Sequence, residues 1–96
     1  MFTIHHVDKD QKGAYVALTE DKQLAGQMTY SRSNEKLIII DHTDVESAFG
    51  GQGVGKLLVQ AAIKDAVEGD YKILPLCPFA KAYFDKHPEE VAAIKG

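Results

Sequence analysis

The segment SAFGGQGVGKLL, residues 47–58, places four glycines within six positions, immediately before residues that favour a helix. The first amide groups of a helix have no partner inside it and carry a partial positive charge, so they attract anions. Glycines let an anionic group approach those amides, because no Cβ atom stands in the way. The spacing therefore predicts a loop that binds a phosphate or another anion. A tight turn that only connects two elements is the structural alternative.

Two common phosphate-binding patterns fit this segment poorly. The nucleotide-binding P-loop matches Gly50, Gly55 and Lys56, but it requires a Ser or Thr next, and this chain has leucine there. The dinucleotide-binding pattern G-x-G-x-x-G fails because Gly51 and Gly53 are followed by a lysine at the position of the third glycine. Both mismatches argue against a nucleotide as the ligand of this loop.

Two side chains elsewhere could take part in nucleophilic or acid–base chemistry. Cys77 precedes Pro78, a residue type favoured at the first position of a helix, and a helix N-terminus favours a thiolate. The alternative for Cys77 is a small, buried apolar residue. His42 follows an apolar strand, and its imidazole could accept a proton near neutral pH. Strand alternation places it on the face of Ile38 and Ile40, so a buried structural histidine is the alternative.

The bulk composition predicts a small soluble globular protein. A chain of 96 residues suffices for one core, so residues 1–96 are expected to form a single domain. A net charge of −3 provides no basic surface for nucleic acid or an anionic membrane, and the longest apolar run, LIII, cannot span a bilayer. One cysteine and no visible secretory signal favour the cytoplasm. No carboxylate or cysteine completes a cluster with His5 and His6, so no metal site is expected.

The first half of the chain has the pattern of an antiparallel β-meander. Strand-forming residues occur in four segments that are separated by turn-forming residues such as DKDQKG, DKQ and SNEK. The expected strands lie within residues 3–7, 14–20, 24–32 and 36–45.

The periodicity changes at Gly53. A helix is expected over residues 53–68, ended by Gly69, with one polar stripe and most of its circumference buried. A strand over 71–76 and a helix ending before Pro88 follow, and the tail EEVAAIKG is expected to be helical and peripheral. The order β-β-β-β-α-β-α predicts an α+β, or mixed α/β, fold with helices packed on one sheet. The apolar residues expected to be buried on the first helix are Val54, Leu57, Leu58, Val59, Ala61, Ala62, Ile63, Ala66 and Val67.

The segment VESAFGGQGVGKLL, residues 45–58, resembles motif A of the GNAT superfamily of acetyl-CoA-dependent N-acetyltransferases. In that motif a strand ending in valine leads into a pyrophosphate-binding loop that opens a helix. The family favours Arg or Gln at position 50, where this chain has glycine. The resemblance implies that the pantetheine arm runs along Thr43, Asp44 and Val45. It also implies that the coenzyme phosphates contact Gly50, Gly51, Gln52, Gly53, Val54, Gly55 and Lys56.

The segment CPFAKAYF, residues 77–84, resembles the family's segment Asn-x-x-Ala-x-x-Phe/Leu-Tyr, which opens the helix beneath the coenzyme. Cys77 replaces the asparagine, and Phe84 replaces the tyrosine that acts as general acid. The resemblance implies coenzyme contacts from Cys77, Phe79, Tyr83 and Lys86. It places Cys77 near the thioester, as an acetyl-accepting nucleophile or as a polar neighbour. Tyr83 would either protonate the leaving thiolate or pack beneath the coenzyme.

The two motifs occur in the right order, cover roughly residues 37–88 and resemble the very short GNAT-like proteins. They imply a minimal GNAT-like fold and an acetyl-CoA-dependent N-acetyltransferase with Cys77, His42 and Tyr83 as candidate catalytic residues. A coenzyme A-binding module without significant turnover, acting through a partner, is the alternative. Acetyl-CoA is the only co-substrate expected, and the acceptor is an unidentified primary amine on a small molecule or a protein. The short connections leave no room for the two helices that larger members insert between their first strands. The acceptor side is therefore expected to be open in a monomer, or completed in a weak homodimer or by a partner.

Overall fold

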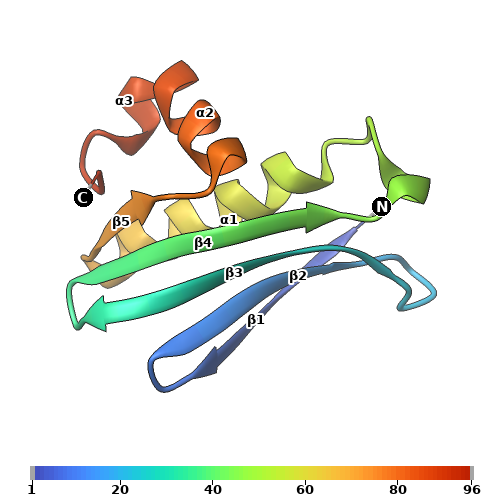
Figure 1. The fold of residues 1–96 in the computed structure, drawn as a ribbon, viewed down its shortest axis with the longest axis horizontal. Helices are drawn as coiled ribbons and strands as arrows, with labels where there is room; N and C mark the ends of the chain where they lie inside the picture. Colours follow the sequence, from blue (N-terminus) through green and yellow to red (C-terminus); the bar gives the residue numbers. More distant parts are fainter. Residues whose placement is uncertain (1, 96) are drawn as a thin grey trace.

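One five-stranded sheet forms the centre of the protein in the computed structural model, which describes residues 2–95 (Figure 1). Its spatial order, β1-β2-β3-β4-β5, follows the order of the strands in the chain. The first four strands are antiparallel and β5 runs parallel to β4, which confirms the predicted meander followed by a crossover. The strands are β1 Thr3–Lys9, β2 Lys12–Leu18, β3 Leu24–Asn34, β4 Leu37–Val45 and β5 Lys72–Pro75.

In the described part of the chain, three α-helices and a short 3-10 helix accompany the sheet, and the predicted α+β class is confirmed. Helix α1 crosses behind the sheet in Figure 1 and packs on β2 and β3, whereas α2 and α3 lie above the sheet, beyond β5 (Figure 1). None of the helices within residues 2–95 is long and apolar enough to cross a bilayer. The helices are η1 Ser47–Phe49, α1 Val54–Gly69, α2 Pro78–Lys86 and α3 Pro88–Val91.

Helix α1 begins after Gly53, as the sequence predicts, but Gly69 is still helical, and Asp70 rather than Gly69 is the left-handed residue that ends the helix, with φ = 58°. Leu58 and Val59 are fully buried against the sheet, but Leu57 is 36% exposed and Val67 is 55% exposed. The prediction that apolar residues bury most of the circumference is therefore wrong at these two positions. The sheet contacts only one side of α1, so the buried face is narrower than the apolar pattern suggested.

The C-terminal tail contributes to the core, contrary to the prediction of a peripheral helix. Helix α3 has only four residues, and Val91 and Ile94 are almost completely buried. The amide of Ile73 donates to the carbonyl of Ile94 at 2.7 Å, and Ile73 forms a parallel bridge with Lys95. The tail thus lies against the free side of β5 and shields it from solvent.

An extra residue in β4 changes which side chains face the helices. Tyr30 pairs with Ile40, whereas the preceding residue of β3, Thr29, pairs with His42, so Asp41 is a β-bulge. The bulge shifts the alternation, and the imidazole of His42 is exposed. The prediction that His42 shares the buried face of Ile40 is therefore wrong.

A polar cluster joins the first three strands to α1 on the helix-covered face. The hydroxyl of Tyr15 donates to Asp65 Oδ2 at 2.7 Å, and the hydroxyl of Tyr30 lies 2.6 Å from His6 Nε2 and donates to Asp8 at 3.3 Å. Burial and the nearby Asp65 carboxylate raise the pKa of Tyr15. Burial and the charge of Asp8 raise the pKa of Tyr30 to about 12. Both tyrosines are therefore held in their neutral form by the fold.

Candidate active site

The loop between η1 and α1 adopts a conformation that requires glycine at two positions. Gly51 has φ = 80° and Gly53, the N-cap of α1, has φ = 77°, both in the left-handed region. A Cβ atom at either residue would meet no described atom within 4 Å, so the requirement comes from the backbone alone. Gly50 differs, because its φ of −60° suits any residue.

Five backbone amides in this region, those of Gly51 and of residues 53–56, are free to bind an anion. The amides of Gly50 and Gln52 are already engaged, with the carbonyls of Ser47 at 3.2 Å and Phe49 at 3.4 Å. Within residues 2–95, no backbone acceptor outside the helix engages the amides of Gly51, Gly53, Val54, Gly55 and Lys56. The last three belong to the first turn of α1, where the helix dipole also favours a negative charge. The loop therefore has the donors that the anion-binding hypothesis needs, although Gly50 and Gln52 do not supply them.

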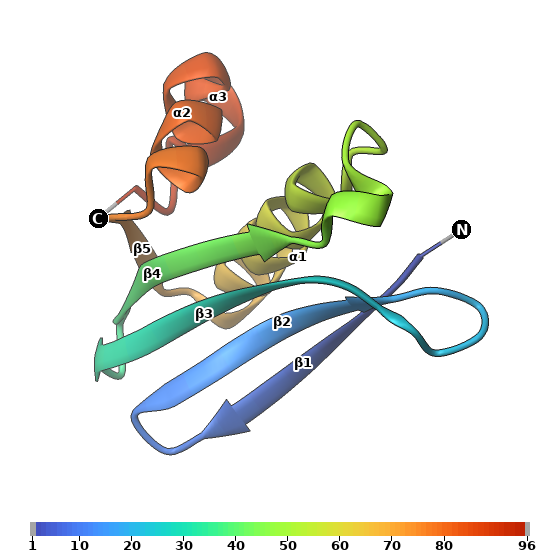
Figure 2. The same cartoon turned by 45° about the vertical axis from the view of Figure 1, so that its right-hand side comes forward.

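A close contact brings the two sequence motifs together. A Cβ atom added to Gly55 would lie only 2.6 Å from Cζ of Phe79, which belongs to the first turn of α2. A side chain at position 55 would therefore displace the Phe79 ring, so glycine there serves the packing of α1 against α2. The glycine loop and α2 lie on the same side of β4 (Figure 2).

A hollow of about 250 Å³ lies beside this contact, and its lining includes four of the predicted coenzyme-binding residues. The Tyr83 hydroxyl at its floor accepts from Gln60 at 3.2 Å and donates to Glu90 at 2.9 Å. Burial, outweighing the opposing hydrogen bond from Gln60, raises the pKa of Tyr83, and Glu90 acts in the same direction. The hollow is lined by Lys56, Phe79, Ala82, Tyr83, Lys86 and His87.

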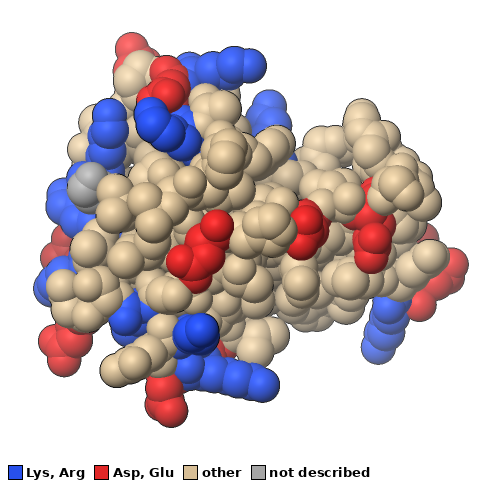
Figure 3. Space-filling model, in the orientation of Figure 1, with Lys and Arg blue, Asp and Glu red and all other residues tan. Residues whose placement is uncertain are grey.

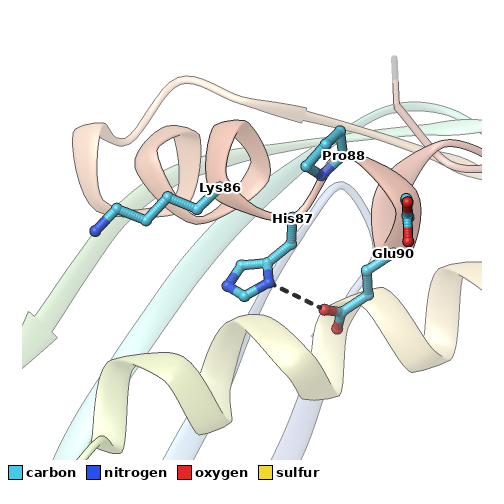
Figure 4. A pocket seen from close by; sticks show the side chains of 5 residues that line it. Lys86, His87, Pro88 and Glu90 are labelled. Carbon is cyan, nitrogen blue, oxygen red and sulfur yellow. Dashed lines mark ion pairs between the residues drawn. The ribbon is translucent and has the colours of Figure 1, made fainter.

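A second hollow of about 410 Å³ adjoins the first one and is lined by residues 86–90 (Figure 4). His87 stacks on the Tyr83 ring with centroids 4.2 Å apart, and its Nδ1 lies 3.9 Å from Glu90 Oε2 (Figure 4). His87 follows the last residue of α2, and Ala82 lies one turn after Phe79, but neither was predicted from the sequence to belong to the site. Both were therefore missed as lining residues.

Strands β4 and β5 stop pairing partway along β4, and the point where they part is called the notch. The two strands pair only as far as Ile40 and Pro75, and the amides of Leu76 and Cys77 then both donate to the Ile40 carbonyl at 3.1 Å. Beyond this point the chain enters α2, while β4 continues to Val45, paired only with β3. The part of β4 that β5 does not pair with includes Thr43, Asp44 and Val45, along which the resemblance places the pantetheine arm.

Cys77 lies at the base of the notch as the N-cap of α2, and its side chain is only 3% exposed. Its thiol donates a hydrogen bond to Thr43 Oγ1 at 3.3 Å. Burial by itself raises the pKa of this thiol. The Thr43 hydroxyl and the backbone amides of Ala80, Phe79 and Thr43 favour the thiolate more strongly, so the pKa lies below its ordinary value. Cys77 therefore has the predicted position at the start of a helix, and the pKa of its thiol is shifted in the direction that this position favours. Burial, however, limits access to the sulfur.

His42 and Asp44 form an exposed pair on β4, with 3.0 Å between Nε2 and Oδ2. Asp44 and Val45 also line a hollow of about 210 Å³ together with Gly26 of β3. A Cβ atom on Gly26 would lie 2.8 Å from the Asp44 carbonyl oxygen and 2.9 Å from the Val54 side chain. Gly26 thus allows the first residues of β3 to lie close to β4 and α1. A glycine within a strand could have indicated such an approach, but it was missed.

Acidic side chains lie over β4 and its end, whereas basic and acidic side chains occur together over α2 and α3 (Figure 3). Asp41 and Asp44 are exposed on β4. On α2, Lys81 pairs with Asp85 at 3.2 Å, and Lys86 is exposed. A cationic ligand is therefore favoured along β4.

These features define an α+β fold with a glycine loop whose amides are free, two strands that part beyond their paired region, and a hydrogen-bonded thiol at the point where they part. The chain belongs to the GCN5-related N-acetyltransferase family, whose model matches residues 14–94. The predicted membership of the GNAT superfamily is thereby confirmed.

Known proteins that resemble the chain agree with this assignment. A GCN5-like protein from Staphylococcus aureus, solved by NMR, is 30% identical with a TM-score of 0.70, and the match covers 96% of this chain and 88% of that one. A GNAT family acetyltransferase from Elizabethkingia anophelis with acetyl-CoA bound is 16% identical with a TM-score of 0.69, covering 91% and 74% of the two chains, and supports the fold. Protein NATD1 from Xenopus tropicalis is 33% identical over 61 residues, which are 64% of this chain and 56% of that protein. The chain thus matches little more than half the length of this last relative.

Proposed function

We propose that the protein transfers an acetyl group from acetyl-CoA to a primary amine. The observation that carries the proposal is the contact of Phe79 with Gly55, which joins the glycine loop and the Cys77 helix into one site. Family membership and the acetyl-CoA bound in the Elizabethkingia anophelis structure support it.

The coenzyme phosphates are proposed to bind the free amides of Gly51 and Gly53 to Lys56, with further charge from Lys56 and Lys86. Lys56 and Lys86 line the same hollow as Phe79, so one bound coenzyme can contact both the lysine ammonium groups and the Phe79 ring there. The pantetheine arm is proposed to lie along Thr43 to Val45, where β4 has no neighbour on the side of β5.

The chemical step is proposed to be direct attack of the amine nitrogen on the thioester carbonyl carbon. The new C–N bond forms, the C–S bond breaks, the amine releases a proton and the coenzyme A thiolate takes one up. His42, exposed and paired with Asp44, is proposed to receive the amine's proton. Proximity of two bound reactants supplies on the order of 7–11 kcal/mol, so no covalent enzyme intermediate is needed. The geometry favours packing beneath the coenzyme as the role of Tyr83, because its hydroxyl is bonded to Glu90 and Gln60.

Titration calorimetry with acetyl-CoA, coenzyme A and ATP, followed by a thiol-release assay over a panel of amines, tests the proposal. We expect the two forms of coenzyme A to bind, ATP not to bind, and at least one amine to accelerate thiol release. His42→Ala should lower the rate more at neutral pH than at pH 9, because more of the acceptor amine is already deprotonated at pH 9. Binding without turnover for any amine would instead indicate the coenzyme-binding module. Failure to bind acetyl-CoA would rule out both.

A further inference from the structure

The β-bulge at Asp41 directs the side chain of Thr43 toward Cys77. Alternation from Ile40 without a bulge would place residue 43 on the opposite side of β4 from the core. The extra residue reverses this, and the Thr43 hydroxyl reaches the Cys77 sulfur at 3.3 Å. Bulges commonly redirect side chains next to functional sites.

The bulge itself is held by a side-chain contact across the strands. Ser31 Oγ, on β3, donates to Asp41 Oδ2 at 2.7 Å. This bond fixes the orientation of the one residue of β4 that has no partner in the ladder. The position of Thr43, two residues further along, depends on it.

We propose that Thr43 is a positioning residue, whose hydroxyl holds the Cys77 sulfur at the base of the notch and donates a hydrogen bond to it once the thiol has lost its proton. The inference rests on the proposed function for its catalytic meaning, since it concerns the sulfur beside the expected thioester. It goes beyond that proposal because Thr43 serves there only as part of the strand edge along which the pantetheine arm lies.

The chemistry of the two groups suits this role. A hydroxyl can accept a hydrogen bond from a thiol and, after rotation, donate one to a thiolate. Among residues 2–95, Thr43 provides the only side chain that hydrogen-bonds to Cys77. The lowered pKa of the thiol agrees with a donor at this place, because burial alone would act in the opposite direction. A valine at position 43 would keep the shape and remove the donor.

The test measures the rate of Cys77 alkylation by iodoacetamide against pH, by mass spectrometry. Cys77 is the single cysteine of the chain, so the signal is unambiguous. For Thr43→Val we expect the midpoint of the profile to rise by about one pH unit, the size expected for losing one hydrogen bond to a charged group. Thr43→Ser should restore the midpoint. Thr29→Val, a half-buried threonine on the neighbouring strand, is the matched control and should leave it unchanged.

The midpoint is the decisive quantity, because the burial of Cys77 is common to all variants and does not produce a difference in midpoint between them. A folded Thr43→Val protein with an unchanged midpoint would overturn the proposal, as would a shift that Thr43→Ser fails to reverse. Should Thr43→Val not fold, Thr43→Ala is judged by the same criteria. The measurement needs no acetyl-CoA, so a chain without transferase activity that still shows the shift would refute the proposed function and leave the role of Thr43 intact. Normal acetyl transfer with no shift of the alkylation midpoint would support the proposed function and refute the role of Thr43.

Discussion

Alanine substitutions in the glycine loop should separate the glycines that the backbone requires from the one that it does not. Gly51 and Gly53 have φ values of 80° and 77°, and this left-handed conformation costs a residue with a Cβ atom about 1–2 kcal/mol. No described atom lies within 4 Å of either Cβ position, so steric clash adds nothing to that cost. Gly50, with φ = −60° and only an ordinary contact at 3.5 Å, is the matched control.

The cost must appear in one of two measurements. If the loop keeps its conformation in Gly53→Ala, the free energy of unfolding falls by about 1–2 kcal/mol and acetyl-CoA binding is unchanged. If the loop relaxes to negative φ, stability is spared, and binding must restore the left-handed conformation at the same cost. The loss of unfolding free energy in urea and the loss of binding free energy by calorimetry should therefore add up to about 1–2 kcal/mol, whichever way they divide.

The comparison with Gly50→Ala decides the result. We expect Gly50→Ala to change both quantities by no more than about 0.5 kcal/mol, as is usual for an unstrained surface position. If Gly53→Ala behaved like Gly50→Ala in both measurements, the left-handed conformation of Gly53 would not be required, and its role as the N-cap that presents the free amides would be refuted.

Two further predictions concern the core. Leu58→Asp should lower the free energy of unfolding, measured by urea denaturation, by about 3–5 kcal/mol, because it leaves a charge buried and unpaired. Leu57→Asp, at the exposed neighbouring position, should lower it by less than about 1 kcal/mol. Equal effects would show that the buried face of α1 is misassigned. Because the pKa values of Tyr15 and Tyr30 are raised in the folded protein, their contribution to stability is fully present below about pH 10, the ordinary pKa of tyrosine, and decreases above it, where only the unfolded chain ionises. Tyr30→Phe should therefore make the melting temperature less dependent on pH between about pH 10 and 12. An unchanged pH dependence of the melting temperature would contradict the buried hydrogen bond of Tyr30.

Much of the fold follows from local sequence chemistry. The start of α1 is predictable because Gly53 precedes a change of period, and the strands are predictable because β-branched and aromatic residues alternate between turns. The width of the buried face of α1 could not be predicted, because it depends on how much of the helix the sheet covers. The same holds for Val91 and Ile94, since a short apolar tail does not reveal that the free side of β5 is available to it.

The candidate site shows the same division between local and distant causes. The free amides of the loop follow from glycines and a helix start, both of which are local. The contact of Gly55 with Phe79 joins residues from two helices, and only the packing of α1 against α2 reveals that glycine 55 serves the fold in addition to the ligand. Gly26 was missed for a related reason, since it is the approach of β4 and Val54 that requires it.

The bulge in β4 is the clearest case, because one residue decides which side chain faces the notch. Alternation assigned the inward position to His42, yet the insertion of Asp41 exposes that imidazole and turns Thr43 toward Cys77. The contact that stabilises the insertion, from Ser31 to Asp41, joins residues ten positions apart on two strands whose register is unknown before folding. In the proposed reaction, the base His42 must meet an amine from solvent and therefore needs exposure, and the Cys77 sulfur, beside the proposed position of the thioester, needs a fixed polar neighbour. The bulge meets both requirements at once: without it, His42 would point into the core and Thr43 away from the sulfur.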